Sequence, residues 1–114
     1  MVDDEEAIRL LVSTILTQSE CAVDATGDAG EALAKLESTS YDIVLMDIRM
    51  PGMSGMELYA RVIDKHPELT GKVIFITGDT SDASVREYLV SHNLAYMTKP
   101  FDRKTLEEKV NGLL

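Results

Sequence analysis

The sequence lacks several features that mark common classes of protein. Its 114 residues include one cysteine, Cys21, so a disulfide within the chain is excluded and a reducing, cytosolic setting is expected. The longest apolar runs, IVLM at 43–46 and VIFI at 73–76, are far shorter than the roughly 20 residues that cross a bilayer. The first residues do not resemble a signal peptide. We therefore expect a cytoplasmic protein that does not enter the membrane.

Positive charge is also scarce. The chain carries 11 Lys and Arg against 20 Asp and Glu, a net charge of −9, and its basic residues form no cluster along one face of a predicted element. Proteins that bind nucleic acid or anionic membranes present such basic patches. Direct binding of nucleic acid by this domain is therefore not expected.

The length and the 45% hydrophobic content fit one domain over residues 1–114, and the apolar pattern predicts five helices. Asp28 with Glu31, and Ser54 with Glu57, have the spacing of capping boxes at helix starts. The predicted helices lie over residues 5–18, from Asp28, from Ser54 to the region of Pro67, after Asp82, and from about Asp102.

Short apolar runs between the helices predict strands at residues 22–25, 43–46, 73–76 and 95–97. The two central runs show no polar alternation, as expected of parallel strands that are covered on both faces. Strands that alternate with helices predict an α/β fold with a doubly wound parallel sheet of five strands, in the order 2-1-3-4-5. Met1 and Val2 form only a stub of the first strand, which lies inside such a sheet. We therefore expect that the natural domain includes upstream residues.

Polar residues follow the predicted strands at their carboxyl ends, where ligands bind in open parallel sheets. Asp3 and Asp4 follow the stub, Asp47 follows the run at 43–46, Thr77 follows the run at 73–76, and Lys99 follows the last strand. Three carboxylates at one sheet edge repel one another unless a cation or protons lie between them. This sheet edge is therefore the predicted functional site.

The donor types in this set favour a hard divalent cation. Mg²⁺ prefers six oxygen ligands and takes one or two carboxylates with waters and phosphate oxygens, and Mn²⁺ is the alternative. No His or Cys accompanies the acids, which argues against zinc. We predict that Asp4, Asp47 and a backbone carbonyl just beyond Asp47 bind the metal, with Asp3 beside them.

The same residues suit phosphoryl transfer. A carboxylate such as Asp47 can attack phosphorus and form an acyl phosphate. The transferring group spreads negative charge over three oxygens, which the metal, the Lys99 ammonium group and the Thr77 hydroxyl can meet.

Four strings carry a resemblance to a known family: VDDEE, DIVLMDIRMPGMSGMEL, VIFITGD and YMTKPF. One alone would be a weak signal, but four in this order are specific. With them the chain resembles the receiver domain of bacterial response regulators over nearly all its length. The ITGDT string is similar to that of receivers carried on hybrid sensor kinases.

The resemblance implies a flavodoxin-like fold and a role for each site residue. Asp47 would be the phosphoacceptor, Asp3 and Asp4 the acid pair that serves Mg²⁺, and Lys99 the charge partner. The backbone carbonyl of Arg49 would bind the metal. The implied conformational switch consists of Thr77, which moves toward the phosphoryl group, Tyr96, which turns between exposed and buried positions, and Pro100, which is preceded by a cis peptide bond.

The resemblance also implies partners. The phosphoryl donor would be a histidine kinase or a histidine phosphotransfer protein, and the output partner is not identified. A homodimer through the face of the fourth helix, fifth strand and fifth helix is a further expectation. Such a domain is not an enzyme in the usual sense, because it catalyses only its own phosphotransfer and slow autodephosphorylation.

Structural interpretations remain open for each residue. Asp3 and Asp4 can begin a helix, Asp47 can serve a turn, Lys99 can be solvated, and Thr77 can be an ordinary strand residue. Tyr96 can be a core residue of its strand.

Three other functions compete with the phosphorylated switch. The domain can be a receiver-like interaction module that is not phosphorylated, or a metal-dependent phosphohydrolase, which would want a second acid where Arg49 stands. A third alternative is flavodoxin-like electron transfer, but this sequence has no evident phosphate-binding loop and few aromatic residues. A separate hypothesis pairs Arg49 with Asp79 across the mouth of the site, where the pair would slow hydrolysis of the acyl phosphate.

Overall fold

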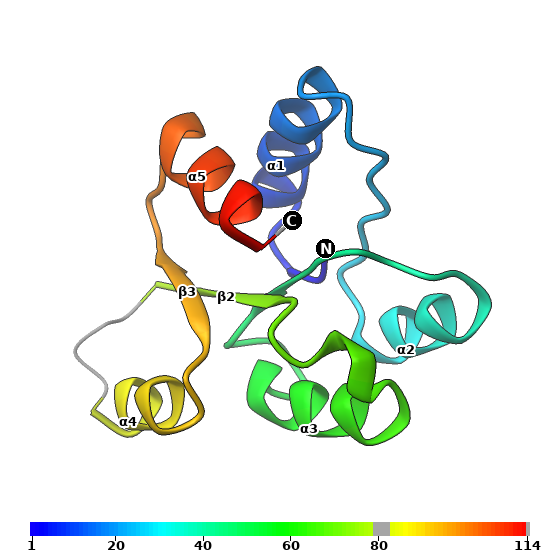
Figure 1. Cartoon of the computed structure of the whole chain (residues 1–114), viewed down its shortest axis with the longest axis vertical. Helices are drawn as coiled ribbons and strands as arrows, with labels where there is room; N and C mark the ends of the chain where they lie inside the picture. Colours follow the sequence, from blue (N-terminus) through cyan, green and yellow to red (C-terminus); the bar gives the residue numbers. More distant parts are fainter. Residues whose placement is uncertain (79–82, 114) are drawn as a thin grey trace.

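The computed structural model describes residues 1–78 and 83–113, and a parallel sheet lies at its centre (Figure 1). Its three strands are β1 (Val44–Asp47), β2 (Val73–Thr77) and β3 (Ala95–Thr98), in the order β1-β2-β3. Met46 pairs with Phe75, and Phe75 with Tyr96. The strands predicted at residues 43–46, 73–76 and 95–97 are therefore confirmed.

Two further segments extend this sheet by single bridges. Val2 bridges in parallel to Met46 on one side and to Thr26 on the other. The Val2 amide donates to the Leu45 carbonyl at 2.8 Å, and the Thr26 amide donates to the Met1 carbonyl at 2.9 Å. The segments therefore follow one another as Thr26, Val2, β1, β2 and β3, which is the predicted 2-1-3-4-5 order.

The strand predicted at residues 22–25 is wrong. Only Thr26, just past the predicted end, forms a bridge. Beside this run, the Thr26 amide and carbonyl bond to Met1 and Asp3, and within residues 22–25 the Asp24 carbonyl accepts from Met1. An apolar run forms a strand only where a paired backbone lies beside it.

In the described residues five α-helices surround the sheet, and two of them, α2 and α3, start at the predicted caps. The Asp28 carboxylate accepts from the Glu31 amide at 2.9 Å, and the Ser54 hydroxyl accepts from the Glu57 amide at 3.2 Å. The bounds are α1 (Glu6–Gln18), α2 (Ala29–Ser38), α3 (Gly55–Lys65), α4 (Ala83–Ser91) and α5 (Arg103–Leu113), with a 3-10 helix at Pro67–Leu69. The helix predicted after Asp82 is confirmed by α4, whereas Ser81 and Asp82 themselves lie outside the described residues.

The helices cover both faces of the sheet. Helices α1 and α5 lie on one face, and α2, α3 and α4 lie on the other (Figure 1). Successive strand residues serve opposite cores: Met46 and Phe75 pack toward α3, and Leu45 and Ile74 pack toward α1 and α5. Among the described residues no helix is long and apolar enough to cross a membrane.

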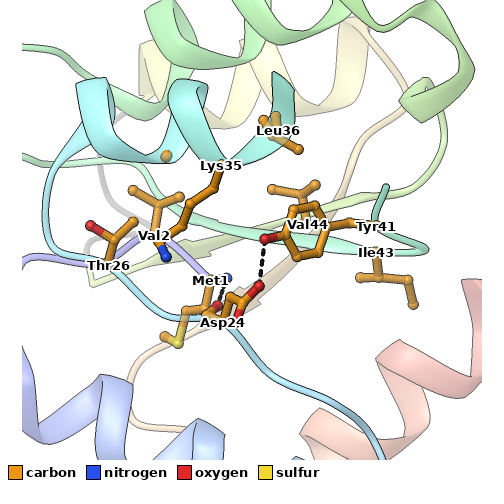
Figure 2. A pocket seen from close by; sticks show the side chains of 10 residues that line it. Met1, Val2, Asp24, Thr26, Lys35, Leu36, Tyr41, Ile43 and Val44 are labelled. Carbon is orange, nitrogen blue, oxygen red and sulfur yellow. Dashed lines mark hydrogen bonds between the residues drawn. The ribbon is translucent and has the colours of Figure 1, made fainter. Parts of the chain in front are cut away.

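The N-terminal backbone is tied to its neighbours around a small cavity (Figure 2). The Met1 amino group donates to the Asp24 carbonyl at 2.7 Å, and the Tyr41 hydroxyl donates to the Asp24 carboxylate at 2.5 Å. The cavity is about 30 Å³, which is enough for a water molecule. These contacts hold the segment that leads into the predicted site.

Candidate functional site

The carboxyl ends of the paired segments bring the predicted residues to one edge of the sheet. The Asp47 amide donates to the Val2 carbonyl at 2.8 Å, which sets Asp47 beside the Val2–Asp3 segment. The Lys99 amide donates to the Thr77 carbonyl at 2.7 Å, which carries the β2–β3 pairing one step past the strands. Backbone pairing therefore places each of these side chains.

The acid side chains form a compact group. Asp3, Asp4 and Asp47 each offer a carboxylate oxygen, and these oxygens all lie within 4.8 Å of one another. Asp3 and Asp47 are buried, with exposures of 0% and 4%, and Asp4 is exposed. The predicted acid cluster is thus present, open to solvent on the side of Asp4.

The cluster fits a divalent cation. The Asp3 Oδ2 atom is buried and has no hydrogen-bond partner among the described residues, although the Lys99 Nζ atom lies 3.2 Å away. A buried carboxylate oxygen is costly unless it is paired or binds a metal. Three carboxylates with no nitrogen or sulfur donor form an oxygen site of the kind that Mg²⁺ or Mn²⁺ prefers.

Lys99 supplies positive charge to the buried end of the cluster. Its Nζ atom lies 3.2 Å from Asp3 Oδ2 and 3.5 Å from Asp47 Oδ2, and its side chain is 15% exposed. Burial lowers the pKa of Lys99, but the hydrogen bond to Glu5 and the charges of Asp47 and Asp3 outweigh this effect, so the pKa is raised. Lys99 is therefore a cation in this site at neutral pH.

The metal-free surroundings of Asp47 favour its protonated form. Burial, and next the charge of Asp3, raise its pKa from 3.8 to about 7, while Lys99 and the backbone amide of Arg49 act in the opposite direction. Burial and a neighbouring like charge are the two causes expected to raise the pKa of a carboxyl group. A cation in the cluster would reverse this balance.

Asp47→Asn should stabilise the metal-free protein above neutral pH. Because the pKa of Asp47 is raised on folding, the folded state binds more protons than the unfolded state, and stability falls as the pH rises from 3.8 to about 7. Asparagine has no such titration. In chelator, we expect the midpoint of thermal unfolding to exceed that of the wild type by more at pH 8 than at pH 5, by at least roughly 4 °C at pH 8.

Mg²⁺ provides the control for this prediction. Added at pH 8, it should raise the unfolding midpoint of the wild type and narrow the difference from Asp47→Asn, because a ligand of the native state stabilises it. An equal difference at both pH values would contradict the assigned charge state of Asp47.

Of the residues predicted to form the switch, Thr77 and Pro100 lie at the same edge, and Tyr96 lies within β3, where it pairs with Phe75. Thr77 ends β2 and is 4% exposed, and Tyr96 lies on β3 with 36% of its surface exposed. The Lys99–Pro100 peptide bond is cis, as the resemblance implies. Arg49 is exposed, and its backbone amide bonds to Asp47. Asp79, the predicted partner of Arg49, lies outside the described residues.

Three contacts at the site were not predicted from the sequence. Glu5 Oε1 lies 2.7 Å from Lys99 Nζ, and the Arg9 guanidinium donates to the Asp3 carbonyl at 2.7 Å. Gly55, at the start of α3, packs so closely that a Cβ would meet the Asp47 carbonyl oxygen. The position of Glu5 directly after Asp3 and Asp4 could have indicated that it lies near the site. The Arg9 and Gly55 contacts depend on the packing of separate elements and could not be found in this way.

Comparison with known proteins gives consistent matches. Residues 1–111 match the response regulator receiver domain family. The chain is 32% identical to the transcriptional regulatory protein TrcR of Mycobacterium tuberculosis and 33% identical to the CAI-1 autoinducer sensor kinase/phosphatase CqsS of Vibrio cholerae, over 100% and 96% of its own length. It spans 44% of TrcR and 16% of CqsS.

Solved structures agree with this match. The Vibrio cholerae chemotaxis protein CheY4 superposes with a TM-score of 0.89 at 28% identity, over 99% of this chain and 94% of that one. The fold, the order of the paired segments and the sequence match are therefore in agreement. This chain belongs to the family of response regulator receiver domains.

Proposed function

We propose that this domain is a signalling switch that accepts a phosphoryl group on Asp47. The observation that carries the proposal is the position of Asp47: its buried carboxylate lies within 3.5 Å of Lys99 and beside two further acids at the ligand-binding edge of the sheet. Family membership supports the same chemistry.

The transfer needs only the phosphohistidine of the donor and water as reactants. A carboxylate oxygen of Asp47 attacks the phosphorus of a phosphohistidine, and the P–N bond breaks as the O–P bond forms. The imidazole nitrogen keeps the bonding electron pair and takes a proton from water. In autodephosphorylation a water molecule attacks phosphorus and the Asp47 carboxylate leaves, giving inorganic phosphate.

Asp3, Asp4 and Asp47 would hold Mg²⁺ or Mn²⁺, with the Arg49 carbonyl as a further ligand. When bound, the metal neutralises the acids and stabilises the charge of the transferring group. The convergence of these three carboxylates, with oxygens within 4.8 Å of one another, supports this assignment.

Lys99 and Thr77 would bind the phosphoryl oxygens. Lys99 already lies beside Asp47, and its backbone is hydrogen-bonded to Thr77. A fixed ammonium group and a hydroxyl at the site stabilise negative charge without having to reorganise during the reaction.

The output would be a shift between two conformations. Thr77 would move toward the phosphoryl group, and Tyr96, which is partly exposed on β3, would turn inward, with Pro100 shaping the turn after Lys99. An acyl phosphate biases such an equilibrium only by as much as it prefers one state. The face of α4, β3 and α5 would then bind an output partner or a second copy of the domain.

The donor in this proposal is a histidine kinase or a histidine phosphotransfer protein. The relatives include a transcriptional regulator and a sensor kinase, and this chain matches only part of each. Neither an output domain nor a particular kinase follows from these matches.

Incubation with acetyl phosphate and Mg²⁺ tests the proposal. Intact mass should show one added phosphoryl group in the wild type, and this adduct should not form when a chelator is present from the start, nor in Asp47→Asn. Absence of the adduct from the wild type would favour the unphosphorylated interaction module. Steady turnover of several phosphomonoesters would favour the hydrolase.

A further inference from the structure

Lys99 contacts a third carboxylate that lies outside the acid cluster. Its Nζ atom is 2.7 Å from Glu5 Oε1, compared with 3.2 Å from Asp3 Oδ2 and 3.5 Å from Asp47 Oδ2. The contact with Glu5 is thus the shortest of the three, and it is a charge-assisted hydrogen bond.

The backbone of Glu5 is fixed to the site. Its amide donates to Asp3 Oδ1 at 2.9 Å, and Glu5 is the N-cap residue of α1. The Glu5 side chain is 57% exposed, whereas those of Asp3 and Asp47 are almost fully buried. The Glu5 carboxylate therefore meets Lys99 on the solvent side, and the other two meet it from inside.

A phosphoryl group on Asp47 would bring new anionic oxygens to the inner side of Lys99. These oxygens and the Glu5 carboxylate would compete for the same ammonium group. An ammonium group has three donors, but short contacts with both sides require it to lie between them. The contact with Glu5 is formed before the phosphoryl group arrives, so it favours the unphosphorylated state.

We propose that Glu5 is a positioning residue that holds the Lys99 ammonium group at the mouth of the site and thereby slows the phosphorylation of Asp47. The inference rests on the proposed function, because it assigns Glu5 a part in that reaction. In this proposal the rate of phosphorylation depends on whether the Glu5 side chain is long enough to contact Lys99.

The expected effect is modest because Glu5 is exposed. Exposed ion pairs contribute little, and their loss corresponds to a change of about two- to fivefold in a rate or an affinity. Glu5→Gln should therefore raise the rate of phosphorylation by acetyl phosphate with Mg²⁺ about two- to fivefold.

Two variants distinguish the effect of the Glu5–Lys99 contact from the effect of negative charge near the site. Glu5→Asp keeps the charge but shortens the side chain by one methylene, so it should lose the contact with Lys99 and also react faster. Glu6→Gln removes a neighbouring charge on the first residue of α1, and within residues 1–78 and 83–113 no ion pair of Glu6 with Lys99 is formed. Its rate should equal that of the wild type.

A double-mutant cycle supplies a readout that a merely structural role would not move. In the Lys99→Met background, Glu5→Gln should no longer raise the rate, because the contact to be released is absent. Equal stimulation in both backgrounds would show that Glu5 acts independently of Lys99 and would overturn the proposal. So would an unchanged or lower rate in Glu5→Gln alone, or a faster Glu6→Gln.

Binding of beryllofluoride with Mg²⁺, followed by calorimetry, tests the same competition at equilibrium. Glu5→Gln and Glu5→Asp should bind it about two- to fivefold more tightly than the wild type. If the wild type is phosphorylated but these affinities do not change, the role of Glu5 fails and the proposed function stands. If the wild type neither accepts a phosphoryl group nor binds beryllofluoride, both fail.

Discussion

Lys99→Met should slow the phosphorylation of Asp47 by about 10- to 100-fold. A hydrogen bond to a charged group is worth roughly 1.5–3 kcal/mol, which corresponds to this range of rates. Methionine keeps the length and the apolar stem of lysine but cannot donate to a phosphoryl oxygen. The rate of adduct formation with acetyl phosphate and Mg²⁺, followed by intact mass, measures the effect.

The same substitution should also destabilise the metal-free protein. Asp3 and Asp47 would lose the cation that lies 3.2 Å and 3.5 Å from them. Lys104→Met is the matched control, because Lys104 is exposed and its ion pair with Glu108 is long, at 4.0 Å. If Lys99→Met is phosphorylated as fast as Lys104→Met, Lys99 has no role in the reaction.

Gly55→Ala should lower the stability of the fold by about 2–3 kcal/mol, or roughly 10 °C in the unfolding midpoint. A Cβ at this position would press on the Asp47 carbonyl oxygen and lie 2.9 Å from the Ile48 Cα atom. Both neighbours are backbone atoms, of Asp47 and Ile48, so they cannot rotate away as the end of a side chain could. Thermal unfolding followed by circular dichroism measures the effect.

Because the displaced atoms belong to Asp47 and Ile48, Gly55→Ala should also slow phosphorylation under conditions in which the variant is folded. Gly112→Ala is the matched control: Gly112 lies in α5, and, apart from its chain neighbours and the backbone of its own helix, no described atom lies within 4 Å of the position that an alanine Cβ would take there. Alanine at this position should be neutral or stabilising. Equal stability of the two variants would mean that α3 does not pack against β1 as closely as described.

The parts of the fold that depend on local chemistry could be predicted from the sequence. Asp28 and Ser54 cap α2 and α3 because the capping oxygen and the donating amide lie three residues apart. The runs at 43–46 and 73–76 form buried strands because they carry no polar residue that must reach water.

The parts that depend on pairing could not be predicted in the same way. Residues 22–25 have strand-like composition, but the bridge to the neighbouring segment forms at Thr26, just past them. A run of apolar residues says nothing about how much backbone lies next to it.

The candidate site shows the same division. The acids, Thr77 and Lys99 could be placed at one edge because each follows a strand, and their side chains need only point outward from it. The contact of Glu5 with Lys99 joins residues 94 positions apart, and it depends on where α1 begins relative to the turn after β3. No spacing in the sequence encodes that distance.

Reduction of the phosphorylated protein with borohydride tests the central claim most directly, because it converts an aspartyl phosphate into homoserine. After treatment with acetyl phosphate and Mg²⁺, peptide mapping should find homoserine at position 47 and at no other aspartate, and none in a sample kept in chelator. Homoserine at Asp3 or Asp4, or none in the fully treated protein, would contradict the assignment of Asp47 as the phosphoacceptor.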